Sequence, residues 1–267
     1  MARGRTETFL VTKVEAGAAR RLPDELVVEE PLEIRLDDHL VGTTMRTPGH
    51  DFELAAGLCF TDGVLAGAPV TGVRYCATGS AAETGFNVVT VDTDATAPVP
   101  APRVSTTTSS CGLCGSTTLA DLAVRLAPLP PSPPVPLAVL AGVPDRVRAA
   151  QGVFASTGAA HAAAAVDATG EPLVVREDIG RHNAVDKVVG RLLLDGRLPA
   201  SNLVLFVSGR ASFEIVQKAW AAGFATVVAV SAPSALAVAT ARAAGMTLVG
   251  FARDDRLNIY APERGTW

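Results

Sequence analysis

In the N-terminal third of the chain, apolar and polar positions alternate as they do in strands with one buried face. The strands predicted from this alternation span residues 25–36, 40–46 and 85–91. Between the second and the third, apolar residues from Phe52 to Leu58 recur at helical spacing and predict a short helix over 51–60. We therefore expect this part of the chain to be rich in strands.

After residue 137 the pattern changes to short apolar runs that alternate with amphipathic stretches. The apolar runs predict strands over 173–175, 203–207, 226–230 and 247–251. The amphipathic stretches predict helices over 184–194, 212–222 and 233–244, the last with a proline in its first turn. This alternation predicts a layered α/β domain with a mixed, largely parallel sheet. In such sheets, ligands bind at the carboxyl ends of strands, where loops enter helices.

Two proline-rich stretches, 95–102 and 128–136, separate these regions. The second predicts an extended connector, since consecutive prolines favour neither helix nor sheet. The expected parts are a strand-rich N-terminal region over 1–104, a cysteine-bearing loop with a helix and the connector over 105–136, and the α/β domain over 137–267.

The composition narrows the class of protein. Hydrophobic residues make up 48% of the chain and charged residues 19%, which is typical of a globular protein and excludes a disordered one. The formal net charge of −4 gives no reason to expect a nucleic-acid partner.

One uncharged stretch, 219–241, is long enough to be tested as a membrane span. Gly223 and Pro233 divide it and a predicted strand lies inside it, so we expect a strand, a turn and a helix, with no membrane association. No apolar run follows the basic residues at the N-terminus, so no secretory signal is apparent. We therefore expect a cytoplasmic protein, whose thiols stay reduced unless they are functional.

The strongest chemical signal is the pair Cys111 and Cys114, each followed by glycine and preceded by a run of serine and threonine. A predicted helix follows, and the positive end of a helix favours the thiolate form of a nearby cysteine. Three chemistries are open to such a pair: metal ligation, dithiol exchange, or carriage of sulfur as a persulfide.

Zinc binding is the least supported of the three. One C-x-x-C segment supplies two ligands, whereas a structural zinc site needs four. Cys59 and Cys76 are isolated in apolar surroundings and are expected to lie in the core. The zinc deaminases, which are also α/β proteins, carry an H-x-E motif that this chain does not contain.

Four polar loops adjoin predicted strands and form a candidate ligand site. They span residues 156–161, 176–183, 208–212 and 251–256. Backbone amides, a hydroxyl and a guanidinium in Ser208–Ser212 suit phosphate, and Arg with Asp in Phe251–Arg256 suits phosphate and a guanine edge. His161 either points into a cleft or lies at a strand edge. The candidate ligand-binding residues are Arg181, His182, Ser208, Gly209, Arg210, Phe251, Ala252, Arg253, Asp254, Asp255 and Arg256. The alternative for each loop is an ordinary turn with solvated charges.

Together these segments resemble the FdhD family, the accessory sulfurtransferases of formate dehydrogenases. The matching segments are Cys111–Gly115, the loop ending in His161, Glu177–Gly190, Ser208–Ala219, Ser231–Arg253 and Asn258–Tyr260. The resemblance runs over most of the chain from about Pro31 onward. Its most specific element is the combination of the cysteine pair with the sequence EDIGRHNAVDK.

The resemblance implies a function and a fold. Family members take sulfur from a cysteine desulfurase as a cysteine persulfide and pass it to the metal of molybdenum bis(molybdopterin guanine dinucleotide), or its tungsten form. The formate dehydrogenase catalytic subunit then receives the active cofactor. The family's catalytic domain is similar to cytidine deaminases in its layering but lacks their zinc, and it forms homodimers. No permanently bound metal is therefore expected.

The resemblance also implies roles for individual residues. Cys111 corresponds to the persulfide carrier and Cys114 to its partner, and Phe251–Arg256 falls where the family contacts the pterin cofactor. Family members typically carry a glycine near Asp254, which two successive acids replace here. The cofactor's four phosphates would be offset by four arginines, at positions 181, 210, 253 and 256. The alternatives are a non-catalytic chaperone that shelters the cofactor and a zinc-binding interaction module.

Overall fold

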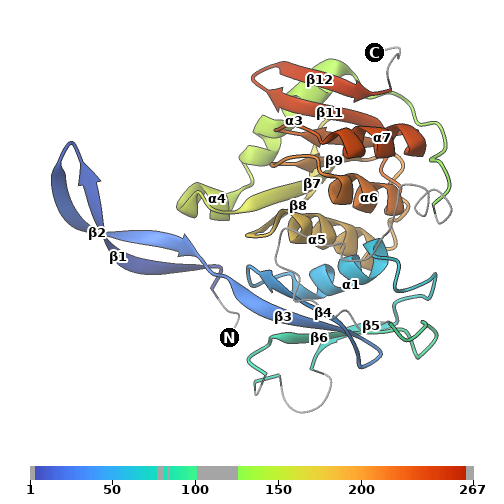
Figure 1. Ribbon diagram of the computed structural model, residues 1–267, viewed down its shortest axis with the longest axis horizontal. Helices are drawn as coiled ribbons and strands as arrows, with labels where there is room; N and C mark the ends of the chain where they lie inside the picture. Colours follow the sequence, from blue (N-terminus) through green and yellow to red (C-terminus); the bar gives the residue numbers. More distant parts are fainter. Residues whose placement is uncertain (1–3, 77–80, 83, 101–125, 263–267) are drawn as a thin grey trace.

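The computed structural model describes residues 4–76, 81–82, 84–100 and 126–262, which form three sheets with helices packed on them (Figure 1). Cys111 and Cys114 lie outside the described residues, as does most of the predicted segment over 105–136.

The largest sheet has six strands in the order β12-β11-β10-β9-β7-β8. These strands are β7 (His161–Val166), β8 (Pro172–Asp178), β9 (Val204–Val207), β10 (Thr226–Ala229), β11 (Thr247–Arg253) and β12 (Arg256–Ala261). Strands β9, β10 and β11 are parallel, whereas β7, β8 and β12 join them by antiparallel pairing. The predicted mixed α/β sheet is confirmed, and its parallel pairing is confined to three adjacent strands.

Helices cover both faces of this sheet, which explains why its central strands are almost wholly apolar. The covering helices are α5 (Arg181–Leu194), α6 (Phe213–Ala221) and α7 (Ala235–Ala244) on one face and α3 (Leu137–Arg148) on the other. Leu205 of β9 belongs to the core under α5 and α6, and its neighbour Phe206 to the core under α3. The side chains of successive strand residues thus pack into cores on opposite faces of the sheet.

A second sheet of four strands lies on the far side of α5, in the order β4-β3-β6-β5. These strands are β3 (Glu30–Leu36), β4 (His39–Arg46), β5 (Gly72–Tyr75) and β6 (Val88–Asp92). Helix α1 (Asp51–Thr61) packs between this sheet and α5, and its Leu54 joins Ile34 and Val89 in a separate core.

Helices α1 and α5 approach closely because each presents a glycine to the other. A Cβ on Gly57 would lie 1.9 Å from the carbonyl oxygen of Asp186, and a Cβ on Gly190 would lie 1.7 Å from that of Glu53. No side chain fits at either position, so the two glycines set the distance between the helices.

The N-terminal residues form a long hairpin of β1 (Thr6–Glu15) and β2 (Ala18–Val27) that projects from the body of the molecule (Figure 1). The short helix α4 (Gly152–Thr157) contacts β2. The prediction of one strand over 25–36 is therefore wrong in its continuity, since β2 ends at Val27 and β3 begins at Glu30.

The other strands and helices predicted within the described residues are present, with small shifts of their ends, whereas the helix predicted after Cys114 lies outside those residues. The last helix begins at Ala235 and not at Pro233, because the hydroxyl oxygen of Ser234 caps it by accepting a hydrogen bond from the Ala237 amide at 3.1 Å. Cys59 and Cys76 are buried, as expected.

The uncharged stretch 219–241 folds as the end of α6, strand β10 and the first part of α7, as predicted. Of the helices within the described ranges, none combines the length and the apolar character that crossing a bilayer requires.

Candidate functional site

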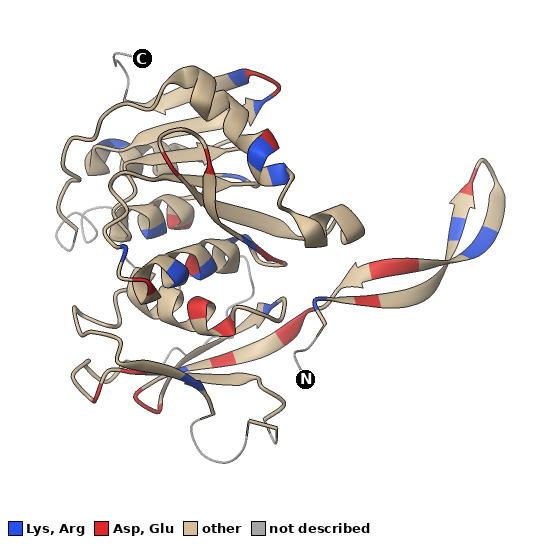
Figure 2. Cartoon of the chain, turned by 180° about the vertical axis from the view of Figure 1, so that it is seen from behind, with Lys and Arg blue, Asp and Glu red and all other residues tan. Residues whose placement is uncertain are grey.

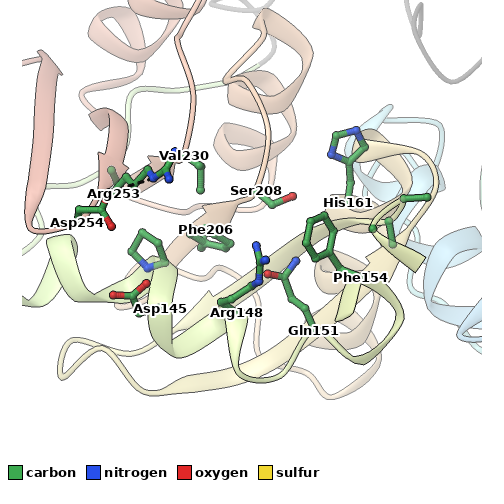
Figure 3. A pocket seen from close by; sticks show the side chains of 15 residues that line it. Asp145, Arg148, Gln151, Phe154, His161, Phe206, Ser208, Val230, Arg253 and Asp254 are labelled. Carbon is green, nitrogen blue, oxygen red and sulfur yellow. Dashed lines mark ion pairs between the residues drawn. The ribbon is translucent and has the colours of Figure 1, made fainter. Parts of the chain in front are cut away.

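A cavity of about 680 Å³ opens at the edge of the six-stranded sheet where ligands are expected. Strands β9 and β10 end there, and β7 begins there because it runs antiparallel to β9. Figure 3 shows side chains that line it from three directions: the sheet edge, the α3–α4 segment and the β11–β12 hairpin.

The sheet edge contributes His161 and Ser208 to the cavity. Burial lowers the pKa of His161, and the positive charge of Arg181 lowers it further, so the imidazole is neutral at neutral pH and can accept a hydrogen bond through one ring nitrogen. The Ser208 hydroxyl oxygen accepts a hydrogen bond from the Ala162 amide at 2.9 Å, which leaves its own proton to donate.

The α3–α4 segment contributes three side chains that sequence reasoning missed. The guanidinium carbon of Arg148 lies 4.3 Å from the centroid of the Phe154 ring, so a cation and an aromatic face are held together at the cavity wall. Gln151 is only 4% exposed and lines the cavity. A buried amide that faces a cavity is available to a ligand.

The β11–β12 hairpin contributes Ala252, Arg253 and Asp254. Asp254 and Asp255 form its turn with φ angles of 50° and 59°, a left-handed conformation that glycine adopts most easily. This geometry accounts for the turn position at which the resemblance implies a glycine. Arg253 bonds to Asp254 at 3.1 Å while both remain largely exposed.

The remaining predicted ligand-binding residues lie around the cavity, without lining it. Gly209 packs against His161, since a Cβ there would lie 3.5 Å from the imidazole Nδ1. The exposed predicted residues are Arg210 after β9, and Phe251, Asp255 and Arg256 on the hairpin.

Arg181 and His182 begin α5 beside this edge, because β8 pairs its last residue with His161. The Nε2 atom of His182 lies 3.4 Å from the Ser212 hydroxyl and 3.9 Å from a carboxylate oxygen of Glu214. Burial works to raise the pKa of Glu214, but the Ser212 hydrogen bond and nearby positive charges outweigh it and lower that pKa. An ionised carboxylate, an imidazole and a hydroxyl therefore meet at the start of α6.

The other polar residues of the EDIGRHNAVDK segment hold the fold together. Both carboxylate oxygens of Glu177 accept hydrogen bonds from the first amides of α4. Asp178 is fully buried and bonds to Lys187 at 2.7 Å. Asp186 bonds to Lys218 of α6 at 2.9 Å. A sequence this dense in charge suggests a binding site, yet these four charges are engaged inside the fold, with each other, with Lys218 or with backbone amides.

The cavity combines two guanidinium groups, the carboxylates of Asp145 and Asp254, a neutral imidazole, a hydroxyl, an amide and the Phe154 ring. This set suits a ligand with an anionic part and a planar, hydrogen-bonding part. Across the described ranges, no three His, Cys, Asp or Glu side chains converge in a way that could hold a metal ion.

Comparison with known proteins places this geometry in context. The family model described as the FdhD/NarQ family matches residues 27–266. A sulfur carrier protein FdhD of Streptomyces avermitilis is 50% identical over 97% of this chain and 94% of its own length. One from Mycolicibacterium paratuberculosis is 49% identical over 94% of each chain.

A solved structure shows the same fold. It is that of a protein from Desulfotalea psychrophila, proposed to be a formate dehydrogenase accessory protein, with a TM-score of 0.76 and 25% identity. The match covers 97% of this chain and 99% of that one, so the N-terminal hairpin and both sheets fall within the aligned length.

Proposed function

Because this chain belongs to the FdhD/NarQ family, we propose that it is a sulfurtransferase that carries sulfur on Cys111 as a persulfide. The donor is a cysteine desulfurase, and the acceptor is the metal of molybdenum bis(molybdopterin guanine dinucleotide), destined for the formate dehydrogenase catalytic subunit. The proposal places the protein in the cytoplasm as a homodimer.

The loading step needs only a thiolate. Cys111 attacks the terminal sulfur of the donor's persulfide, the bond between the donor's two sulfurs breaks, and the donor leaves as a thiolate. The glycines that follow both cysteines suit a thiol that must reach two different partners.

The delivery step gives Cys114 a role. The terminal sulfur of a persulfide must gain two electrons to become a sulfido ligand. When the Cys114 thiolate attacks the inner sulfur of Cys111, the two cysteines form a disulfide and the terminal sulfur leaves as sulfide, so the electrons come from the two thiols.

The observation that carries the cofactor part of the proposal is the cavity at the strand ends. It brings His161, Ser208 and Arg253, which are far apart in the sequence, to one place. A volume of about 680 Å³ is that of a site for one drug-sized molecule, so it fits one nucleotide portion of the cofactor and not all of it. The Arg148 and Arg253 guanidinium groups suit its phosphates, and the Gln151 amide and Phe154 ring suit a planar base.

Mass spectrometry tests the carrier role. After incubation with a cysteine desulfurase and cysteine, we expect one added sulfur atom on Cys111 that a reducing thiol removes. The Cys114→Ser variant should still load but release sulfide only when a thiol is added, and the Cys111→Ser variant should not load. Cofactor binding without any adduct would instead support the non-catalytic chaperone.

A further inference from the structure

The hairpin of β1 and β2, which we call the arm (residues 6–27), is exposed along nearly all of its length (Figures 1 and 2). Phe9, Leu10 and Leu22 are 46%, 59% and 45% exposed, respectively. A two-stranded hairpin is marginally stable in water by itself and usually gains stability from a further strand or a packed face. The arm therefore offers exposed apolar side chains and strand edges with which a partner can pack and pair.

The register of the arm identifies the backbone groups that are free to pair. Its two-residue turn, Ala16 and Gly17, has φ angles of 49° and 82°, and such a turn closes on a hydrogen-bonded pair, here Glu15 and Ala18. Hydrogen-bonded pairs then recur at every second residue. The Val28 amide, which donates to the Arg5 carbonyl at 2.9 Å, fits this alternation. The N–H and C=O groups of even-numbered β1 residues consequently point away from β2.

The two outer edges of the arm are not equivalent. In the same alternation, residue 23 points outward from β2, and it is a proline that cannot donate a hydrogen bond. Helix α4 also contacts β2. The β1 edge contains no proline between Thr6 and Glu15, so it is the edge that can accept another strand.

We propose that the β1 edge pairs antiparallel with β1 of a second copy of this chain, across a two-fold axis at Leu10. In this register Glu7 lies opposite the partner's Lys13, and by symmetry Lys13 lies opposite the partner's Glu7. Thr8 and Phe9 face the partner's Thr12 and the partner's Val11. The outward N–H and C=O groups at Thr8, Leu10 and Thr12 would all be paired.

The charges along the arm favour a second copy of this chain as the partner, and they favour this register over its neighbours. The arm is basic near its tip and acidic toward its base (Figure 2), so two arms running in opposite directions attract each other. Slipping the register by two residues one way places Glu7 opposite the partner's Glu15. Slipping it the other way places Arg5 opposite the partner's Lys13. Both alternatives set like charges face to face, which is destabilising.

The paired arms would form a four-stranded sheet with an apolar stripe on one face. Phe9 and Val11 share that face with Leu22 and Leu26, because directly opposed residues of an antiparallel pair point the same way. Lys13, which bonds to Asp24 of its own chain at 2.8 Å, sits at the edge of this stripe. The second arm thus supplies the third and fourth strands that an isolated hairpin needs.

Sedimentation of the full-length protein tests the contact with two matched proline variants. Thr12→Pro removes an outward N–H from the β1 edge, whereas Ala19→Pro removes one from the β2 edge at nearly the same level of the arm. We expect a dimer for the wild type and for Ala19→Pro, and dimerisation weakened about thirtyfold or more for Thr12→Pro. Circular dichroism of each variant verifies that it is folded.

Two charge variants test the register. Glu7→Lys and Lys13→Glu should each dimerise about tenfold more weakly alone, because each sets two pairs of like charges opposite one another. Mixed in equal amounts they should form a heterodimer of wild-type strength, in which both contacts are oppositely charged.

A monomeric wild type at micromolar concentration, equal effects of the two proline variants, or no gain on mixing would overturn the proposal. The arm contact rests on the homodimer proposed above and not on sulfur transfer. Loading of Cys111 is measured separately, so either idea can fail while the other stands.

Discussion

Asp178 shows how one side chain can join two layers of this molecule. Its carboxylate accepts hydrogen bonds from the Thr47 amide at 3.1 Å and the Gly180 amide at 2.8 Å, and it pairs with Lys187 at 2.7 Å. The Lys187 ammonium in turn donates to the Thr47 carbonyl at 2.9 Å. Because Thr47 follows β4 and Asp178 ends β8, this buried pair fastens the four-stranded sheet to the α/β layers.

Replacing Asp178 with asparagine should therefore destabilise the whole protein. The variant leaves the Lys187 charge buried without a counter-charge, a loss of about 3 kcal/mol or more. Asp195→Asn is the matched control, since Asp195 pairs with Arg191 at 2.8 Å on the surface and should cost less than about 1 kcal/mol. Urea unfolding measures both values, and equal losses would contradict the role given to Asp178.

The pair of Glu53 and Arg176 predicts a pH dependence of stability. Burial tends to raise the pKa of Glu53, but hydrogen bonds from Arg176 and His50 and their charges outweigh it and lower the pKa from 4.5 to about 2. Folding therefore favours the ionised form. This stabilisation is complete above pH 4.5 and is lost as the pH falls toward 2.

The measurement is the free energy of unfolding of wild type and Glu53→Gln across that range. The wild type should be more stable by about 2 kcal/mol at pH 7, a value reduced for partial solvent screening, and the difference should shrink below pH 4.5. Glu29→Gln, which removes a carboxylate at an exposed position, is the matched control. A difference that stays constant from pH 7 to pH 2.5 would argue against the Arg176 pair as its cause.

At the scale of elements, the contact between α1 and α5 depends on two residues without side chains. Gly190→Ala should destabilise the protein by about 2–4 kcal/mol, because its Cβ would lie 1.7 Å from the Glu53 carbonyl oxygen and force the helices apart. Gly142→Ala in α3 is the control, since its Cβ would meet nothing within 4 Å. That change should stabilise the helix by up to about 1 kcal/mol. Thermal unfolding of the two variants should shift in opposite directions.

Some strands and helices could be predicted from the sequence and others could not. The difference lies in how clearly the local pattern of apolar residues indicates the element. Strands such as β9 and β10, buried on both faces, are continuous apolar runs and were predictable. Strand β7 is not, because the alanine run after His161 favours helix, and only its place between β8 and β9 makes it a strand. Helix α3 was not predicted, because it contains Pro144 and follows a proline-rich stretch, and proline disfavours helix interiors.

At the scale of the whole molecule, the cavity depends on topology that no single motif encodes. Ser208 could be predicted at this edge because loops at the carboxyl ends of strands collect ligands, whereas His161 is the first residue of β7, a strand that the sequence does not predict. Arg148, Gln151 and Phe154 could not be predicted, since their place at the cavity follows from the packing of α3 on the face of the sheet and of α4 beside it. Conversely, the charges of EDIGRHNAVDK suggested a site, but the fold pairs most of them internally.

In the proposed function the cavity binds the nucleotide end of the cofactor and Cys111 carries the sulfur. Mutations should therefore separate nucleotide binding from sulfur loading. Arg148→Ala should weaken binding of guanosine diphosphate, the nucleotide end of the proposed cofactor, by about tenfold, because it removes a charge-assisted contact and leaves the Phe154 face uncovered. The same variant should load sulfur on Cys111 normally. Cys111→Ser should bind the nucleotide normally and load no sulfur.

The control is Arg256→Ala, whose side chain is exposed and does not line the cavity. This variant should bind the nucleotide and load sulfur as the wild type does. Calorimetry and mass spectrometry on the same preparations decide the matter: if Arg148→Ala and Arg256→Ala bind the nucleotide equally well, the cavity is not the nucleotide site.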